Sequence, residues 1–320
     1  MGMRKSYIIF AIFTAFMQAV FAVLLFLEKF GILHFYDQIV GVAICVVPAV
    51  GAALTKSCDE EYEEIQRLFY VLFGCNCLVL VWDILGILSS GIANVIASAA
   101  MTIGSFRLLW LYNYGKKKSN TFDGFREIRK EIILFTLILL GRNIFAVFAY
   151  SDEYIAIFSN VRALVQAAGL MFVGAAQYWG EEYAWRGFLQ KPLQEKFGKR
   201  WGIVVLGIIW ETYHFPLWFT IYDLAIWQVG LRYLITVALT FVLGYFYMKT
   251  DNIWAPICGH AIYNAMSAGV LPIEAAVNMG KTGTIIYTLL AVVCFSLFAL
   301  KKEYRKKCKV RVKTKGVGTC

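Results

Sequence analysis

The sequence contains ten apolar stretches, each close to the roughly 20 residues that a helix needs to cross a lipid bilayer. Because unpaired backbone groups are costly in lipid, such stretches cross a membrane as α-helices. We expect spans at residues 6–27, 38–55, 68–88, 91–113, 132–150, 154–180, 202–221, 226–248, 252–271 and 283–300. The sequence therefore predicts an all-α, polytopic transmembrane helix bundle with about 8–10 spans.

Composition supports this fold class. Of the 320 residues, 60% are hydrophobic and only 16% are charged, whereas a soluble domain has about 25% charged residues. An ordinary soluble enzyme and a disordered chain are thereby excluded. The first stretch is long enough to span and has no early small-residue cleavage site, so we expect a retained helix and not a signal peptide. The eight cysteines lack a metal-ligand spacing and are interpreted as core residues and free thiols.

Basic residues indicate the orientation. The net charge is +10, and Lys and Arg gather near the N-terminus, in the loops 114–131 and 188–201, and in the tail 301–320. Ten spans put all four segments on one side, which the positive-inside rule assigns to the cytoplasm. We expect both termini there, in a multi-pass protein of the cell membrane, or of an endomembrane in a eukaryote. The tail would bind anionic lipid and no nucleic acid, and the amphipathic segment 188–201 is a candidate interfacial gate.

Charged residues inside spans are rare and mark either function or buried pairs. Asp83 is mid-span, and we expect it to pair with Arg142 or Arg162. Glu211 is expected to pair with one of the same arginines, to tune a nearby imidazole, or to bind a positive substrate group. A transport pathway through these four residues is the alternative, although we see no internal repeat.

A second group of polar residues has systematic spacings. Glu182 and Arg186 are four apart, so they share a helix face and are expected to form an ion pair. Glu181 is rotated by about 100° and is free of that arginine. We expect these residues to lie in the cytoplasmic half of the bilayer.

Two histidines lie inside apolar spans, and each has a partner one turn away. Trp210 and His214 are four apart, as are His260 and Asn264, and a proline lies near each histidine. A carboxylate and an imidazole can take a proton from a shared water. Imidazole and amide groups can then donate to the oxyanion that forms when an amide is attacked. Zinc held by Glu181, His214 and His260 is the competing interpretation.

Three short motifs occur in order in three spans. Residues 181–186 read E-E-Y-A-W-R, residues 210–214 read W-E-T-Y-H, and residues 260–264 read H-A-I-Y-N after an apolar Trp-Ala-Pro lead. They resemble the E-E-x-x-x-R, F-x-x-x-H and H-x-x-x-N motifs of the CAAX protease and bacteriocin-processing (CPBP, or Abi) family. Trp210 replaces the family's Phe at a position that looks like packing. The resemblance covers about residues 150–270.

The resemblance implies a CAAX-type intramembrane glutamic endopeptidase that hydrolyses a peptide bond. Its partners would be membrane lipids and a substrate that is a prenylated or membrane-associated protein or peptide precursor. Carried over, Glu181 activates water with help from His214, and His260 and Asn264 stabilise the oxyanion. The expected supporting residues are Glu182, Arg186, Trp210 and Glu211. No cofactor is expected, with a divalent metal such as zinc as the alternative.

The same resemblance divides the chain. Residues 1–131 would form about four N-terminal transmembrane helices, residues 132–300 the CPBP-like catalytic bundle, and residues 301–320 a basic cytoplasmic tail. A non-catalytic membrane adaptor or bacteriocin self-immunity protein of the same fold is the second functional hypothesis, in which the motifs serve packing.

Overall fold

The computed structural model describes residues 3–55, 63–114, 120–151, 158–267 and 273–305. Across these ranges every regular element is helical, and the predicted all-α, polytopic bundle is confirmed. In this part of the chain, seven helical segments are long and apolar enough to cross a membrane. Their helices are α1 (Met3–Lys29), α2 (Asp37–Leu54), α3 (Glu63–Ile84), α4 (Ser90–Tyr114), α5 (Phe125–Tyr150), α11 (Ile226–Thr250) and α13 (Ile273–Ser296), the last followed by η4 (Leu297–Leu300).

The three segments that carry the motifs are helical but short or broken. Predicted span 154–180 consists of α6 (Ser159–Val173) and α7 (Ala175–Glu182), and its first four residues lie outside the described ranges. Predicted span 202–221 consists of α9 (Lys199–Tyr213) and α10 (Phe215–Phe219). Predicted span 252–271 contains α12 (Trp254–Ser267), and residues 268–271 also lie outside the description.

The lengths of these motif helices suggest where they belong. With 15, 15 and 14 residues, α6, α9 and α12 are each shorter than an independent span. Broken helices are tolerated at membrane depth where they are buried in protein or line a cavity. The long helices therefore form the frame, and the motif helices lie within it.

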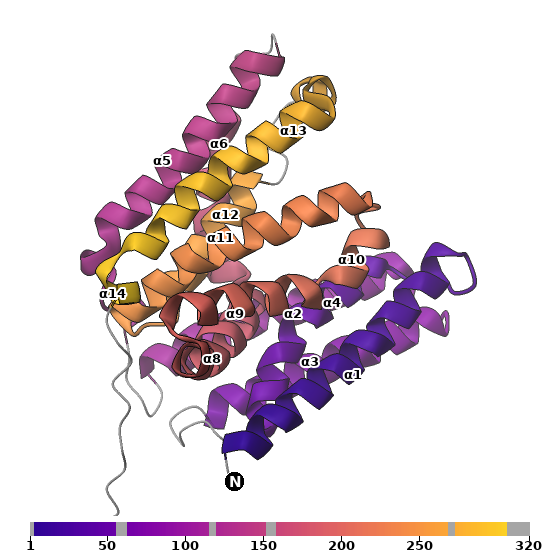
Figure 1. Cartoon of the computed structure of the whole chain (residues 1–320). Helices are drawn as coiled ribbons and strands as arrows, with labels where there is room; N and C mark the ends of the chain where they lie inside the picture. Colours follow the sequence, from indigo (N-terminus) through magenta and orange to yellow (C-terminus); the bar gives the residue numbers. More distant parts are fainter. Residues whose placement is uncertain (1–2, 56–62, 115–119, 152–157, 268–272, 306–320) are drawn as a thin grey trace, which may run out of the picture.

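Two central helices connect the parts of the bundle. In the spans of α2 and α11, 72% and 67% of residues are buried, more than in the other long helices. α2 contacts α1, α3 and α7, while α11 contacts α9, α12 and α13. Figure 1 shows α1–α4 beside α9 and α10 on one side, and α5, α6 and α13 on the other. The motif helices thus pack against the two central helices: α7 on α2, and α9 and α12 on α11.

The basic segments gather at one end of the bundle. Lys199 and Arg200 at the start of α9 donate to the carbonyl oxygens of Glu303 and Ala299, both at 3.0 Å. Lys301 pairs with Glu131 of α5 at 3.0 Å. The same end holds η3 (Tyr183–Gln190), α8 (Lys191–Phe197) and α14 (Lys302–Arg305). The basic residues 116–118 and 306–315 lie outside the described ranges, and the cytoplasmic orientation of this end stays a prediction.

The aromatic rings of α1 and η3 place the start of α1 at this basic end. Tyr7 lies 5.3 Å from Phe188, measured between ring centroids. The four basic segments predicted to share one side of the membrane therefore lie together wherever the structure describes them.

The expected partners of the isolated buried charges were wrong. Asp83 accepts hydrogen bonds from the Tyr36 backbone N–H at 2.7 Å and from the Ser90 hydroxyl at 2.8 Å, and so helps to join α2, α3 and α4. Arg142 instead lies 4.3 Å from the centroid of the Tyr287 ring. Pairing depends on which helices pack together, and sequence spacing alone does not contain that information.

Candidate active site

Glycine allows the first motif to lie directly against α2. At Gly180, an added Cβ would lie 2.5 Å from the carbonyl oxygen of Cys45, so the two helices approach more closely than an alanine permits. From Tyr183 the chain continues as η3, a π-helix, a rare form that is frequent at functional sites. These features place Glu181 at the contact with α2.

Glu182 joins the first and third motifs. Its Oε1 accepts hydrogen bonds from Arg186 Nη1 and from His260 Nδ1, each at 2.9 Å. The side chains of Glu182 and Arg186 are fully buried, so this is a charge-assisted network without competing solvent. The ion pair expected from the four-residue spacing is present. The network also fixes the orientation of the His260 imidazole.

Trp210 has a role that the sequence did not indicate. Its Nε1–H donates to Glu181 Oε2 at 2.8 Å, and its ring lies 4.2 Å from the Arg186 guanidinium carbon. A phenylalanine, the residue at this position of the family motif, has no such donor. The expected packing role is therefore incomplete, because the indole also holds the Glu181 carboxylate by a hydrogen bond.

His214 lies at the point where α9 ends. Pro216 lacks a backbone N–H and helps to end the helix, so His214 caps α9 before α10 begins. The Nδ1 atom lies 2.9 Å from the carbonyl oxygen of Trp210, which can only accept, so we assign the proton of a neutral ring to Nδ1. The Nε2 atom then faces Glu181 Oε2 at 3.7 Å.

Asn252 fixes the start of α12 and with it the third motif. Its side-chain oxygen accepts from the Trp254 N–H at 2.9 Å, and its amide donates to the carbonyl of Asp123 at 2.9 Å. His260 and Asn264 follow on one face of the helix. The Tyr178 ring lies 5.0 Å from the His260 ring, and Tyr178 and Asn264 both line the same cavity.

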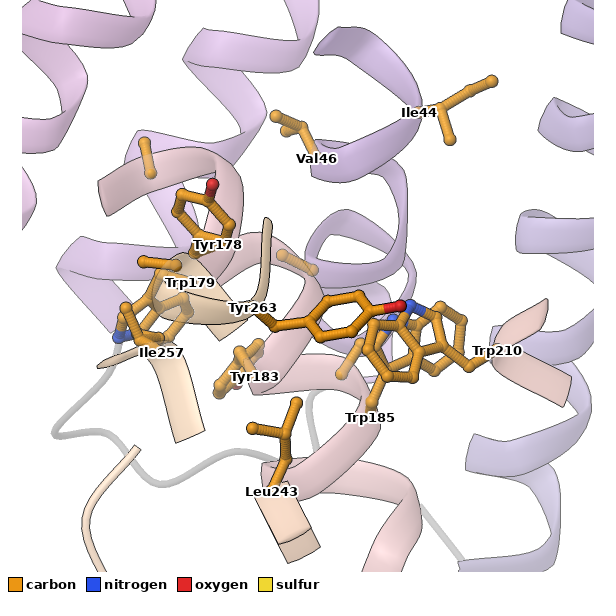
Figure 2. Close-up of a cluster of buried hydrophobic side chains, with 14 of the residues drawn as sticks. Ile44, Val46, Tyr178, Trp179, Tyr183, Trp185, Trp210, Leu243, Ile257 and Tyr263 are labelled. Atoms are coloured by element: carbon orange, nitrogen blue, oxygen red, sulfur yellow. The ribbon is translucent and has the colours of Figure 1, made fainter. Parts of the chain in front are cut away.

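A cavity of about 550 Å³ brings the three motifs together. Six of the predicted site residues line it, and the other two, Glu182 and Arg186, lie behind it in the buried network. The lining residues are Glu181, Trp210, Glu211, His214, His260 and Asn264. Figure 2 shows aromatic side chains of this region: Trp185 of η3 is drawn next to Trp210, whereas Trp179 of α7 lies on the opposite side of the view.

Glu211 has a partner that the sequence did not suggest. Its carboxylate accepts a hydrogen bond from the Thr236 hydroxyl at 2.5 Å and pairs with Arg232 at 3.4 Å, both on α11. The expected pair with Arg142 or Arg162 is wrong because α9 packs on α11. Of the four residues that a transport pathway would use, Glu211 is the one that lines the cavity.

The three candidate ligands of the zinc alternative, Glu181, His214 and His260, line the same cavity. Across the described ranges, no group of three or more His, Cys, Asp or Glu side chains is arranged so that it could hold a metal ion. Whether the site works with or without a metal stays a prediction.

Sequence reasoning missed the contribution of α2 and α11. Gly41 and Cys45 of α2 and Arg232 and Thr236 of α11 line the cavity, as does Tyr178 of α7. None of them belongs to a motif. The available signal was weak: α2 has several small residues, which permit close helix packing, and Arg232 is a charge within an apolar stretch.

A comparison with known protein families identifies the same segment of the chain that carries the three motifs. Residues 163–266 match the family of type II CAAX prenyl endopeptidases described as Rce1-like. The resemblance to CAAX proteases is thereby confirmed for this third of the chain. The Rce1-like segment begins in α6 and ends in α12, so it contains all three motifs. This part of the chain is thus similar to a family of CAAX-type proteases, and it lies within a multi-pass membrane protein. No curated protein and no solved structure matches the chain.

Proposed function

We propose that the chain is an intramembrane endopeptidase that hydrolyses a peptide bond of a membrane-associated precursor. The observation that carries this proposal is the facing pair of Glu181 Oε2 and His214 Nε2, 3.7 Å apart in the wall of the cavity. The His214 Nδ1–H donates to the Trp210 carbonyl, so His214 Nε2 has no hydrogen in a neutral ring. Nε2 and Glu181 Oε2 are therefore both acceptors. A water that lies on the cavity side of the pair, within reach of both atoms, would donate to them.

In the proposed reaction, Glu181 takes one proton from this water as the water oxygen attacks the peptide carbonyl carbon. The carbonyl electron pair moves onto oxygen and forms a tetrahedral oxyanion. Its collapse breaks the C–N bond, and the proton held by Glu181 passes to the leaving nitrogen. His214 orients the water, because its ring is fixed by Trp210 on one nitrogen and leaves the other toward the carboxylate.

The proposed oxyanion donors are His260 and Asn264. His260 gives its Nδ1 proton to Glu182, so a neutral ring would offer only an acceptor at Nε2. The proposed role therefore requires a hydrogen on Nε2 as well, which would point toward the oxyanion. The Asn264 amide, one turn further on α12, supplies the second donor. Glu182 and Arg186 are positioning residues in this scheme.

A comparison of peptides from cells with the wild-type chain or Glu181→Gln tests the assignment. Glu195→Gln, an exposed glutamate on α8, is the matched control for loss of a carboxylate. At equal protein level, we expect one peptide to disappear only in Glu181→Gln while its uncut precursor accumulates. The turnover should fall by about 10²–10⁴-fold, the usual contribution of a general base. Unchanged cleavage in Glu181→Gln would contradict the mechanism.

The non-catalytic hypothesis gives the opposite result in the same experiment. If the chain acts as an adaptor or immunity protein, the peptides of the wild type and of Glu181→Gln are identical, and the cellular phenotype is preserved in the variant.

A further inference from the structure

The cavity is closed toward the basic end of the bundle. Between Glu181 and that end lie Trp185, Arg186 and Gln190 of η3, each at most 1% exposed. Leu243 and Phe246 of α11 and Trp254 of α12 are fully buried beside them. Gln190 also donates to the carbonyl of Gly244 at 3.1 Å, which ties η3 to α11. A peptide would have to displace this layer to reach Glu181 from the basic end.

The cavity is open at the other end. Its exposed lining residues are Gln38 at the start of α2, Tyr222 after α10, and Ser267 at the end of α12. Next to Tyr222, Asp223 pairs at 2.6 Å with Lys29, the last residue of α1. The end of α1 and the start of α2 therefore belong to the rim side, whereas Tyr7 near the start of α1 belongs to the basic end.

Helix α11 runs from the rim side of the bundle to its basic end, so positions along it show in which direction the cavity extends. Trp227 in its first turn contacts Lys281, and Lys249 in its last turn pairs with Glu127 of α5. Its 25 residues cover about 37 Å at 1.5 Å per residue. Arg232, in the second turn, lines the cavity, and Gly244, near the last turn, contacts η3. The cavity thus extends from mid-depth toward the start of α11.

Charge distinguishes the two ends. Toward the rim the described Lys and Arg residues are Lys29, Arg142, Arg162, Arg232 and Lys281. The half toward the closed end has many more, namely Lys5, Arg67, Arg107, Arg126, Arg129, Lys130, Arg186, Lys191, Lys196, Lys199, Arg200, Lys249, Lys301, Lys302 and Arg305. Cytoplasmic segments carry an excess of Lys and Arg, so the closed end is assigned to the cytoplasm. The rim then faces the opposite side of the membrane.

We propose that the substrate enters the cavity from the extracytoplasmic side. This inference rests on the proposed endopeptidase function and specifies its substrate class: a precursor whose scissile segment has already crossed the membrane, such as an exported or membrane-anchored peptide. A substrate that carries its scissile bond in the cytoplasm does not reach Glu181. The expectation that the polar residues gather in the cytoplasmic half of the bilayer stays a prediction, and the proposal concerns only the side from which their cavity is reached.

The cavity wall fits an extended apolar segment. Leu217, Trp218, Ile221 and Leu224, which follow His214, line the route from the rim to Glu181. Arg232 lies 4.0 Å from the centroid of the Trp218 ring and pairs with Glu211 at 3.4 Å, so its charge is balanced within the wall. Apolar contact along this wall selects for a hydrophobic peptide.

Cysteine labelling tests the sidedness without requiring hydrolysis. The full-length chain in intact cells or spheroplasts is treated with a charged, membrane-impermeant thiol reagent, and labelling gained over the parent chain is measured. Gln38→Cys reports the rim, and the matched variant Lys196→Cys reports an exposed position at the closed end. We expect Gln38→Cys to be labelled from outside and Lys196→Cys only after permeabilisation. The reverse pattern would overturn the inference.

A second measurement tests the route itself. A bulky impermeant reagent bound to Gln38→Cys from outside should lower cleavage of the identified substrate by tenfold or more. The same reagent on Lys196→Cys in permeabilised membranes should leave cleavage unchanged. Unaffected cleavage after complete labelling of Gln38→Cys would overturn the route. External labelling of Gln38→Cys in a chain that cleaves no peptide would instead refute the endopeptidase function and leave the sidedness of the cavity supported.

Discussion

Replacing Gly180 by alanine tests whether the close approach of α7 to α2 sets the position of Glu181. The new Cβ would lie 2.5 Å from the Cys45 carbonyl oxygen and 3.3 Å from the Val46 Cα. Ordinary contacts begin at 3.4 Å, so α7 must move away from α2 by about 0.9 Å, since the obstacle is backbone and cannot rotate aside. A clash of this kind usually costs about 1–3 kcal/mol of folding free energy.

The same displacement should affect activity more than stability. Glu181 is the next residue, and its hydrogen bond to Trp210 is 2.8 Å long, so a shift of this size breaks it or moves the carboxylate away from His214. A misplacement of about 1 Å can lower the rate of an enzyme by about 10²-fold. We expect Gly180→Ala to retain the fold in detergent, to unfold at a lower temperature and to cleave the substrate about 10²-fold more slowly.

Gly169→Ala is the matched control for this prediction. Gly169 lies in α6, with nothing within 4 Å of the added Cβ, so alanine should raise helix stability by roughly 0.5–1 kcal/mol without moving Glu181. The measurement is thermal unfolding of both purified variants together with cleavage of the substrate identified by peptide comparison. Wild-type unfolding and wild-type cleavage in Gly180→Ala would refute the argument from close packing.

Three further predictions concern charge and metal. Arg186→Met leaves the buried Glu182 carboxylate with His260 alone, so unfolding should be easier by about 3–5 kcal/mol, and a wild-type unfolding temperature would contradict this. Cleavage by purified protein should persist after dialysis against a metal chelator, whereas loss restored by added zinc would contradict the water mechanism. Lys29 holds the pKa of Asp223 below its usual value through a hydrogen bond, so the pair stabilises the fold above pH 3.8 and ceases to do so as the pH falls through the lowered pKa of Asp223. Asp223→Asn should therefore lower the unfolding temperature at pH 7, and this difference from the wild type should shrink as the pH falls through the lowered pKa of Asp223.

The sequence predicted the helical elements well because hydropathy is a local property. Each of the ten apolar stretches corresponds to a helix or to a pair of helices. The positions where helices break were harder to predict from the sequence. Pro216 indicated the break between α9 and α10, whereas the break between α6 and α7 at Gly174 was not predicted. The π-helix after Glu182 has no local signal that we recognise.

The candidate site was predicted in part for a similar reason. Motif spacing identified residues that share a helix face, such as Glu182 and Arg186, and the structure joins them in an ion pair. Contacts between distant helices were not predictable. Cys45 and Gly180 meet across 135 positions, and Glu211 pairs with Arg232 through the packing of α9 on α11. The motifs indicated which residues matter, and the packing of the frame determines how they are oriented.

The short length of the motif helices has a consequence for how the protein is made. The long apolar helices can enter the bilayer one by one as the chain is synthesised, whereas α6, α9 and α12, at 14–15 residues, depend on neighbours already in place. The Glu181 carboxylate and the His214 and His260 imidazoles therefore meet only in the completed bundle. If the proposed endopeptidase function holds, an unfinished chain would have no assembled hydrolytic centre and would become active only after the last of these helices has packed.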